Sequence, residues 1–149
     1  MIRHFRGRWY VIGQLEHTDE VKIFALDRIL EMEISKNVFL KDPAFNYDSK
    51  FKNSFGIYAS DDGVVEDVEL IFTASDGYYI KSSPLHHSQQ IIADDETGLT
   101  IKLSLVITED FIMELLSHSS SISVVKPDWL KQKLNDIHEI AISRSQELA

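Results

Sequence analysis

The chain has 149 residues, of which 44% are hydrophobic and 26% are charged, a balance typical of one ordinary globular domain or two small ones. It contains no cysteine, which excludes disulfides, thiolate metal sites and cysteine nucleophiles. No apolar run approaches the roughly 18 residues that cross a bilayer, and the start does not resemble a signal peptide. We therefore expect a cytoplasmic protein with no membrane contact.

The formal net charge of -9 argues against broad, non-specific binding to a phosphate backbone, which needs a positive surface field. The charge is uneven, however. Residues 1–36 contain six basic and six acidic side chains, whereas the remainder has nine basic and eighteen acidic ones. An anionic ligand is therefore expected near the N-terminal arginines Arg3, Arg6, Arg8 and Arg28, although a merely solvated strand edge would explain the first three equally well.

Three strands are predicted at the N-terminal end. Residues 8–15 and 21–27 are rich in β-branched and aromatic side chains and are separated by a polar segment, which predicts a hairpin. Residues 29–34 alternate between apolar and mostly acidic side chains with a period of two, which predicts a third strand. Three strands cannot close a barrel, so a partner chain or the rest of the protein must cover the open edge.

A linker is expected over residues 37–63. Its aromatic side chains suggest that it packs on another part of the protein, and a short helix is expected over residues 48–53. Asp61-Asp62-Gly63 is typical of a turn, in which the glycine supplies a positive φ.

The C-terminal part shows a regular order of patterns. Strands are predicted over residues 65–74, 88–94, 99–108 and 121–125, and in the first of them Val68, Leu70 and Phe72 lie on one face. Helices are predicted over residues 77–82 with a Ser75-Asp76 cap, from the Thr108 cap to Leu116, and over residues 129–144. The order β-α-β-β-α-β, followed by a helix, predicts an α+β fold with a ferredoxin-like domain.

The N-terminal hairpin resembles the end of a WYL domain. The segment Trp9-Tyr10-Val11 differs from the family's Trp-Tyr-Leu by valine for leucine. The segment 22–29, Lys-Ile-Phe-Ala-Leu-Asp-Arg-Ile, resembles the family's second motif with lysine for its leading arginine and alanine at a position that is often polar or basic. Phe55-Gly56-Ile57 resembles the junction between barrel and extension.

Many WYL proteins continue into a ferredoxin-like C-terminal extension, called WCX. The resemblance therefore implies three parts: residues 1–36 as the last strands of an SH3- or Sm-like WYL β-barrel, 37–63 as a linker with a short helix, and 64–149 as a WCX extension. It places the chain in the ligand-sensing and oligomerisation region of a bacterial transcriptional regulator. A homodimer is implied, and double-stranded DNA would be bound only by a helix-turn-helix domain ahead of this chain, whose start falls inside the barrel.

The family resemblance also implies an anionic effector, such as a nucleotide or single-stranded nucleic acid. We expect no cofactor. Aromatic rings can stack on bases, and guanidinium groups can hold phosphate with two hydrogen bonds. Arg8, Tyr10, Lys22 and Arg28 would share one face of the hairpin if Tyr10 lies opposite an even position of the second strand. The predicted ligand-binding set is Arg8, Trp9, Tyr10, Lys22 and Arg28, although Trp9 also suits a core position and Arg28 a structural ion pair with Asp27.

No catalytic motif accompanies these residues, and we expect no enzyme activity. His86-His87-Ser88 lacks a Gly-x-Ser-x-Gly elbow, and the histidines lack a metal-binding spacing. Two other functions stay open because fold alone assigns none. One is a plain dimerisation module in which Trp129, Leu130 and the last helix contact a partner. The other is an amino-acid-binding domain, for which Gly77 is the candidate turn glycine.

Overall fold

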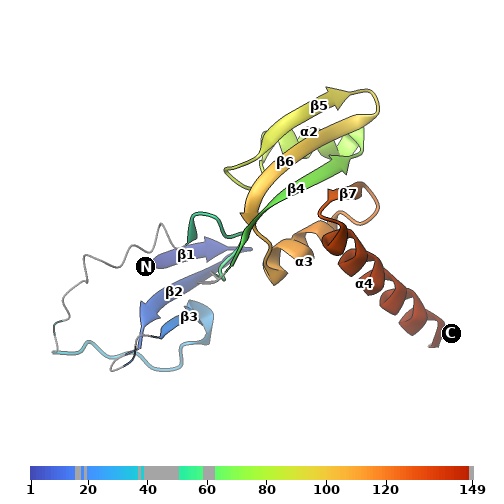
Figure 1. Ribbon diagram of the computed structural model, residues 1–149. Coiled ribbons are helices and arrows are strands. Elements are labelled where there is room, and N and C mark those ends of the chain that lie inside the picture. Colours follow the sequence, from blue (N-terminus) through green and yellow to red (C-terminus); the bar gives the residue numbers. More distant parts are fainter. Residues whose placement is uncertain (16–17, 19, 37, 39–50, 59–62, 148–149) are drawn as a thin grey trace.

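A computed structural model describes residues 1–15, 18, 20–36, 38, 51–58 and 63–147. They form an α+β structure with two separate antiparallel sheets and no closed barrel (Figure 1). Most of the predicted 37–63 linker lies outside the described residues. This applies to residues 48–50 of its expected short helix and to the Asp61-Asp62 part of its expected turn.

The N-terminal sheet has the order β1-β2-β3, formed by Ile2–Phe5, Arg8–Gln14 and Val21–Ala25. The predicted hairpin is confirmed, because β2 pairs antiparallel with β3. Strand β1 lies ahead of the three strands expected from the sequence and was not predicted. It joins β2 through Arg6 and Gly7, whose φ angles of 47° and 77° are both positive, as a two-residue type I′ hairpin turn requires.

The predicted third strand over residues 29–34 is wrong. A short 3-10 helix, η1 (Leu26–Arg28), follows β3, and residues 29–35 form neither helix nor strand. Leu30 and Ile34 are 97% and 99% exposed, so the alternating pattern has no surface to pack against. A strand needs a hydrogen-bonding neighbour, and the turn at η1 takes the chain away from the sheet edge that would supply one.

The second sheet has the order β5-β6-β4-β7, formed by Gln90–Asp95, Gly98–Val106, Val65–Phe72 and Ile122–Lys126. The helices are α2 (Ala74–Ser82), α3 (Glu109–Ser117) and α4 (Asp128–Glu147). This order and connectivity confirm the ferredoxin-like βαββαβ arrangement with one extra C-terminal helix. The Thr108 cap is confirmed too, because its hydroxyl accepts a 3.2 Å hydrogen bond from the Phe111 amide. The Ser75-Asp76 cap is wrong, since α2 begins at Ala74 and Thr73 precedes it.

One face of this sheet carries the main core. Val68, Leu70 and Phe72 of β4 are fully buried, as their spacing predicts. Strand β6 places its own inward residues beside them, and the helices cover the same face with apolar side chains: Ile80, Phe111, Ile112, Leu115, Leu130 and Leu134. The other face is largely exposed, which explains the alternation of polar and apolar residues along β4 and β6.

Residues 51–58 connect the two sheets. Ser54 bridges Val106 at the end of β6, and the Phe55 ring lies edge-on to Phe5 of β1 and to Phe111 of α3, at centroid distances of 6.0 and 5.3 Å. Arg6 adds a 2.7 Å ion pair with Glu114 of α3. The N-terminal sheet is therefore tied to the C-terminal domain through an aromatic row and one charged contact.

Candidate functional site

The register between β2 and β3 decides which predicted ligand-binding residues can act together. Tyr10 lies opposite Ala25, and Lys22 lies opposite Gly13. Directly paired residues share a sheet face, and successive residues alternate between faces. Arg8 and Tyr10 are therefore on one face, while Trp9 and Lys22 are on the other. Tyr10 therefore does not lie opposite an even position of β3, and Lys22 lies on the opposite face of the sheet from Arg8 and Tyr10.

The face with Arg8 and Tyr10 also carries two residues of β1. Arg3 pairs with Tyr10, and Phe5 pairs with Arg8. The Arg3 guanidinium stands 4.9 Å from the centre of the Phe51 ring, a cation–π distance. Burial lowers the pKa of Arg3 below its ordinary value, and the negative charge of Asp110 opposes that shift. This partly buried cation forms no ion pair with any residue that the structure describes, so an anion brought to it would be bound favourably.

Arg3 is one of the arginines near which an anion was expected, but it is absent from the predicted ligand-binding set because its strand was not recognised. Arg3, Phe5 and their neighbours Ile2 and His4 alternate between the two faces of a strand. That signal was missed because four residues are too few to separate a strand from an irregular start.

Arg8 and Asp27 form an ion pair beside Arg28, the last residue of η1. The Arg8 side chain reaches Asp27 across η1 at 3.7 Å, and both side chains are 52% exposed. The structural pair suggested for Arg28 with Asp27 is therefore formed by Arg8 instead. Arg28 itself has no ion pair within the described part of the chain. Because exposed ion pairs contribute little, Asp27 holds Arg8 in place without greatly reducing its availability to a ligand.

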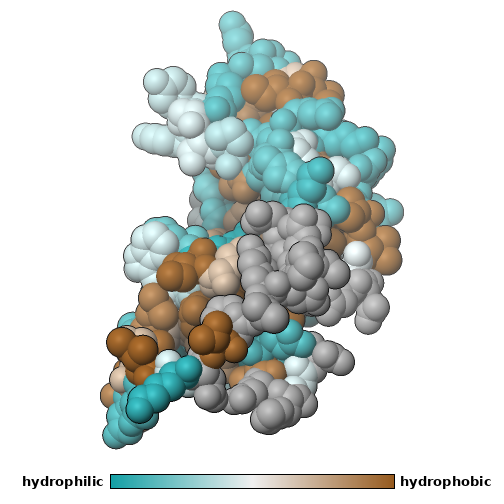
Figure 2. Space-filling model, turned by 90° about the vertical axis from the view of Figure 1, so that its left-hand side faces the viewer, coloured by the Kyte–Doolittle hydropathy of each residue, from teal (hydrophilic) through white to brown (hydrophobic). Residues whose placement is uncertain are grey.

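The opposite face of the N-terminal sheet is apolar and open. Trp9 is 55% exposed and stacks at a tilt on His4, so it is not the core residue that a strand tryptophan usually is. Ile2, Val11 and Phe24 form a row across the three strands, and Lys22 pairs with Glu20 beyond it. Figure 2 shows hydrophobic surface gathered on the part of the molecule that contains this sheet.

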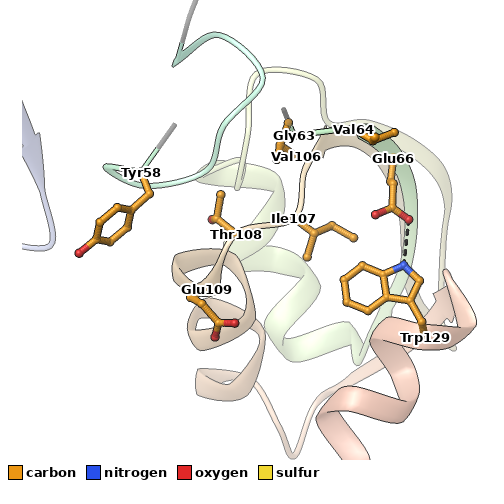
Figure 3. Close-up of a pocket in the computed structure, with 9 residues that line it drawn as sticks. All are labelled: Tyr58, Gly63, Val64, Glu66, Val106, Ile107, Thr108, Glu109 and Trp129. Atoms are coloured by element: carbon orange, nitrogen blue, oxygen red, sulfur yellow. Dashed lines mark hydrogen bonds between the residues drawn. The ribbon is translucent and has the colours of Figure 1, made fainter. Parts of the chain in front are cut away.

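A groove lies at the start of the C-terminal domain (Figure 3). Its volume is about 590 Å³, and it lies between residues that end the connecting segment, begin β4, follow β6 and begin the last two helices: Tyr58, Gly63, Val64, Glu66, Val106, Ile107, Thr108, Glu109 and Trp129. Tyr58 and Trp129 stand on opposite sides with Ile107 between them. The Trp129 indole N–H donates a 2.9 Å hydrogen bond to Glu66. Sequence reasoning did not find this groove, because its residues come from four separate segments.

The His86-His87-Ser88 segment anchors a loop. Ser88 and His86 form a hydrogen bond, with 2.7 Å between the Ser88 hydroxyl and Nδ1 of His86. The same hydroxyl accepts a hydrogen bond from the Ser104 amide, and His87 contacts the Lys52 carbonyl. Nε2 of His86 is buried and has no hydrogen-bond partner among the described residues, so none of their carboxylates orients this imidazole as in a catalytic triad.

Gly77 also has a structural explanation. A β-carbon added there would come within 2.7 Å of Leu99, so glycine allows α2 to pack closely on β6. Gly77 therefore lies inside α2 and does not form the turn that the amino-acid-binding alternative requires.

Comparison with known families gives two matches: the WYL domain over residues 1–34 and the WCX domain over residues 65–141. The chain belongs to the WYL–WCX family. The two domains match the WYL and WCX resemblances expected from the sequence, in the same order along the chain. No curated protein matches its sequence.

Among solved structures, this WYL–WCX chain is similar to proteasome accessory factor B/C (PafBC) of Arthrobacter aurescens. The two are 17% identical with a TM-score of 0.38, over 85% of this chain and 19% of that one. This chain therefore spans about a fifth of the length of PafBC. No helix among the residues described here is long and apolar enough to cross a membrane.

Proposed function

We propose that the WYL part of this chain binds an anionic, nucleotide-like effector on the sheet face that carries Arg3, Arg8 and Tyr10. The observation that supports this most is the cross-strand pairing of Arg3 with Tyr10, two residues from Arg8 on the same face. We include Arg28, the last residue of η1, in the proposed binding group. The chain is then the sensing and oligomerisation region of a bacterial transcriptional regulator, with no catalytic role.

The chemistry of this face suits a phosphate attached to an aromatic base. Guanidinium groups donate paired hydrogen bonds to phosphate oxygens, and a tyrosine ring offers a stacking surface that accepts any base. Arg3 is held against Phe51 and Arg8 against Asp27, so neither side chain must be ordered from a fully free state when the anion arrives. Trp9 and Lys22 belong to the predicted set but face the other way, which makes them natural controls.

Binding of fluorescein-labelled single-stranded oligonucleotides and of mononucleotides, measured by anisotropy and calorimetry, tests the proposal. We expect saturable binding that weakens as salt is raised, because phosphate contacts release counterions. Arg8→Ala and Arg28→Ala should each weaken it about tenfold, since a hydrogen bond to a charged group contributes about 1.5 kcal/mol or more. Lys22→Ala removes a cation from the same sheet and should change the affinity only slightly.

Equal binding by wild type, Arg8→Ala and Arg28→Ala would contradict this assignment. A loss in Lys22→Ala equal to that in Arg8→Ala would contradict it as well, because a general attraction to positive charge would then explain the binding.

Self-association through the apolar sheet face is the second candidate function. Ile2, Val11 and Phe24 form a row there, in which Ile2 and Phe24 are exposed and Val11 is half-buried. Exposed apolar surfaces often mark contacts between proteins. Leu130, named as a dimer contact in the interaction-module alternative, is fully buried in the core of its own chain and is not available. A homodimer formed by the N-terminal sheet should dissociate in Phe24→Asp, as measured by sedimentation velocity.

We further propose residues 1–36, 37–63 and 64–149 as the functional divisions of the chain. The first part contacts the effector, and the third part contains the main hydrophobic core. Contact with double-stranded DNA is assigned to a helix-turn-helix domain outside this chain.

A further inference from the structure

The groove between Tyr58 and Trp129 differs in charge from the arginine face of the N-terminal sheet. Among the described residues, its lining includes two carboxylates, Glu66 and Glu109, and no lysine, arginine or histidine. Neither glutamate forms an ion pair with a described residue. The only partner of Glu66 there is the indole N–H of Trp129. Within the described part of the chain, the negative charge of the groove is therefore not compensated by an ion pair.

The remaining lining is apolar and aromatic. Val64, Tyr58 and Trp129 are all exposed, although large apolar side chains of this kind usually pack against something. In Figure 3, the two aromatic side chains stand on either side of Ile107, and Glu109 projects from the first turn of α3 between them. Aromatic faces attract cations, and they do so more strongly where carboxylates stand nearby.

The helix ends that border the groove do not reverse its charge. An unoccupied helix N-terminus attracts anions. Here α3 begins with Glu109 and Asp110 and its Phe111 amide is capped by Thr108, while α4 begins with Asp128. Acidic side chains of the protein itself thus already offset the positive N-terminal ends of α3 and α4.

We infer that this groove binds a small organic cation, an amine or guanidinium with an apolar body. Glu66 and Glu109 receive the charged group, Trp129 and Tyr58 flank it, and Val64, Val106 and Ile107 contact the apolar body. The volume of about 590 Å³ lies within the range of roughly 300–1,000 Å³ of small-molecule sites. The site is separate from the proposed anion site and does not depend on it.

The bond between Glu66 and Trp129 supplies a direct readout. The chain has two tryptophans, so Trp9→Phe leaves Trp129 as the only source of indole fluorescence and of an indole N–H signal. Titration of this variant with n-pentylamine should give a saturable change in both signals, with a Kd on the order of 1 mM for a ligand of this size. The neutral analogue 1-pentanol and the anionic analogue valerate have similar chain lengths and should give no saturable change.

Glu66→Gln and Glu109→Gln, each in the Trp9→Phe background, should weaken pentylamine binding roughly fivefold to tenfold. Glutamine at position 66 retains a carbonyl that can accept the Trp129 N–H, so the groove should keep its shape. Glu69→Gln is the matched control: Glu69 lies on the other face of the same strand, paired with Lys126, and its loss should leave the affinity unchanged.

Two results would overturn the inference. One is an equal response to pentylamine and pentanol, which would mean that only the apolar lining binds. The other is unchanged pentylamine affinity in both glutamine variants, with thermal melting showing that they are folded.

Discussion

The carboxylate of Asp110 lies directly against the α-carbon of Gly56. A β-carbon at position 56 would come within 2.1 Å of its Oδ2 atom, and that oxygen accepts a 3.0 Å hydrogen bond from the Ile57 amide. Gly56 also has a φ of 82°, which side chains disfavour. The junction between the two sheets therefore depends on glycine for two independent reasons, conformation and space.

Gly56→Ala should lower the free energy of unfolding more than Gly7→Ala does. Both glycines have a positive φ, but nothing lies within 4 Å of a β-carbon built at Gly7. The Gly7 substitution should cost about 1 kcal/mol from backbone strain alone. The Gly56 substitution should cost at least roughly twice that, because Asp110 must also move and release Ile57. Urea unfolding measures both values, and equal losses would show that the contact with Asp110 contributes nothing.

Leu103→Ala should destabilise the C-terminal domain by about 2–5 kcal/mol, because Leu103 is fully buried at the centre of β6 and the domain cannot fill the space left. Ile71→Ala is the control. Ile71 lies on the exposed face of β4, and its truncation should cost less than about 1 kcal/mol. Thermal unfolding of the two variants, followed by circular dichroism, checks the difference. Similar losses would mean that the exposed face is covered in solution.

Asp27→Asn should strengthen binding of an anionic effector by a few fold, since it removes the negative charge 3.7 Å from Arg8. The gain should shrink as salt is raised, because screening weakens the repulsion between Asp27 and the ligand. Anisotropy titrations at two salt concentrations measure both effects. In Arg8→Ala the same Asp27→Asn change should give a smaller gain. A full gain in that background would show that Asp27 acts on the ligand without Arg8.

Stability should fall as the pH drops below the ordinary histidine pKa of 6.5. Burial, followed by the nearby charge of His87, lowers the pKa of His86 in the folded protein. The unfolded chain therefore takes up a proton at a pH where the folded chain does not. The contribution of neutral His86 is fully present above pH 6.5 and is lost as the pH falls toward the lower folded pKa. Urea unfolding at a series of pH values should show a shallower dependence in His86→Gln, and an unchanged slope would assign the effect to other groups.

The order of elements in the C-terminal domain could be predicted because each signal is local. Val68, Leu70 and Phe72 define a strand face within five residues, and Thr108 followed by Glu109 and Asp110 marks the start of a helix. The same kind of pattern over residues 29–34 predicted a strand that does not form. Alternation of polar and apolar residues shows that a segment is able to pair as a strand, but it does not show that a neighbouring strand is present. Strand β1 was missed for the opposite reason: its partner β2 stabilises a segment too short to be recognised alone.

The candidate sites depended even more on tertiary structure. The sequence by itself determined the ferredoxin-like order, the WYL hairpin and the concentration of arginines near the start, since these follow from residue types and short spacings. Only the folded structure decided that Tyr10 pairs with Arg3 and Ala25 and that Lys22 lies on the other face, because a shift of one residue in strand register exchanges every side chain between faces. The groove around Glu66 and Trp129 likewise forms only when four distant segments pack together. Strand register and the meeting of distant segments are set by the packing of the whole chain, and neither is encoded in a local pattern.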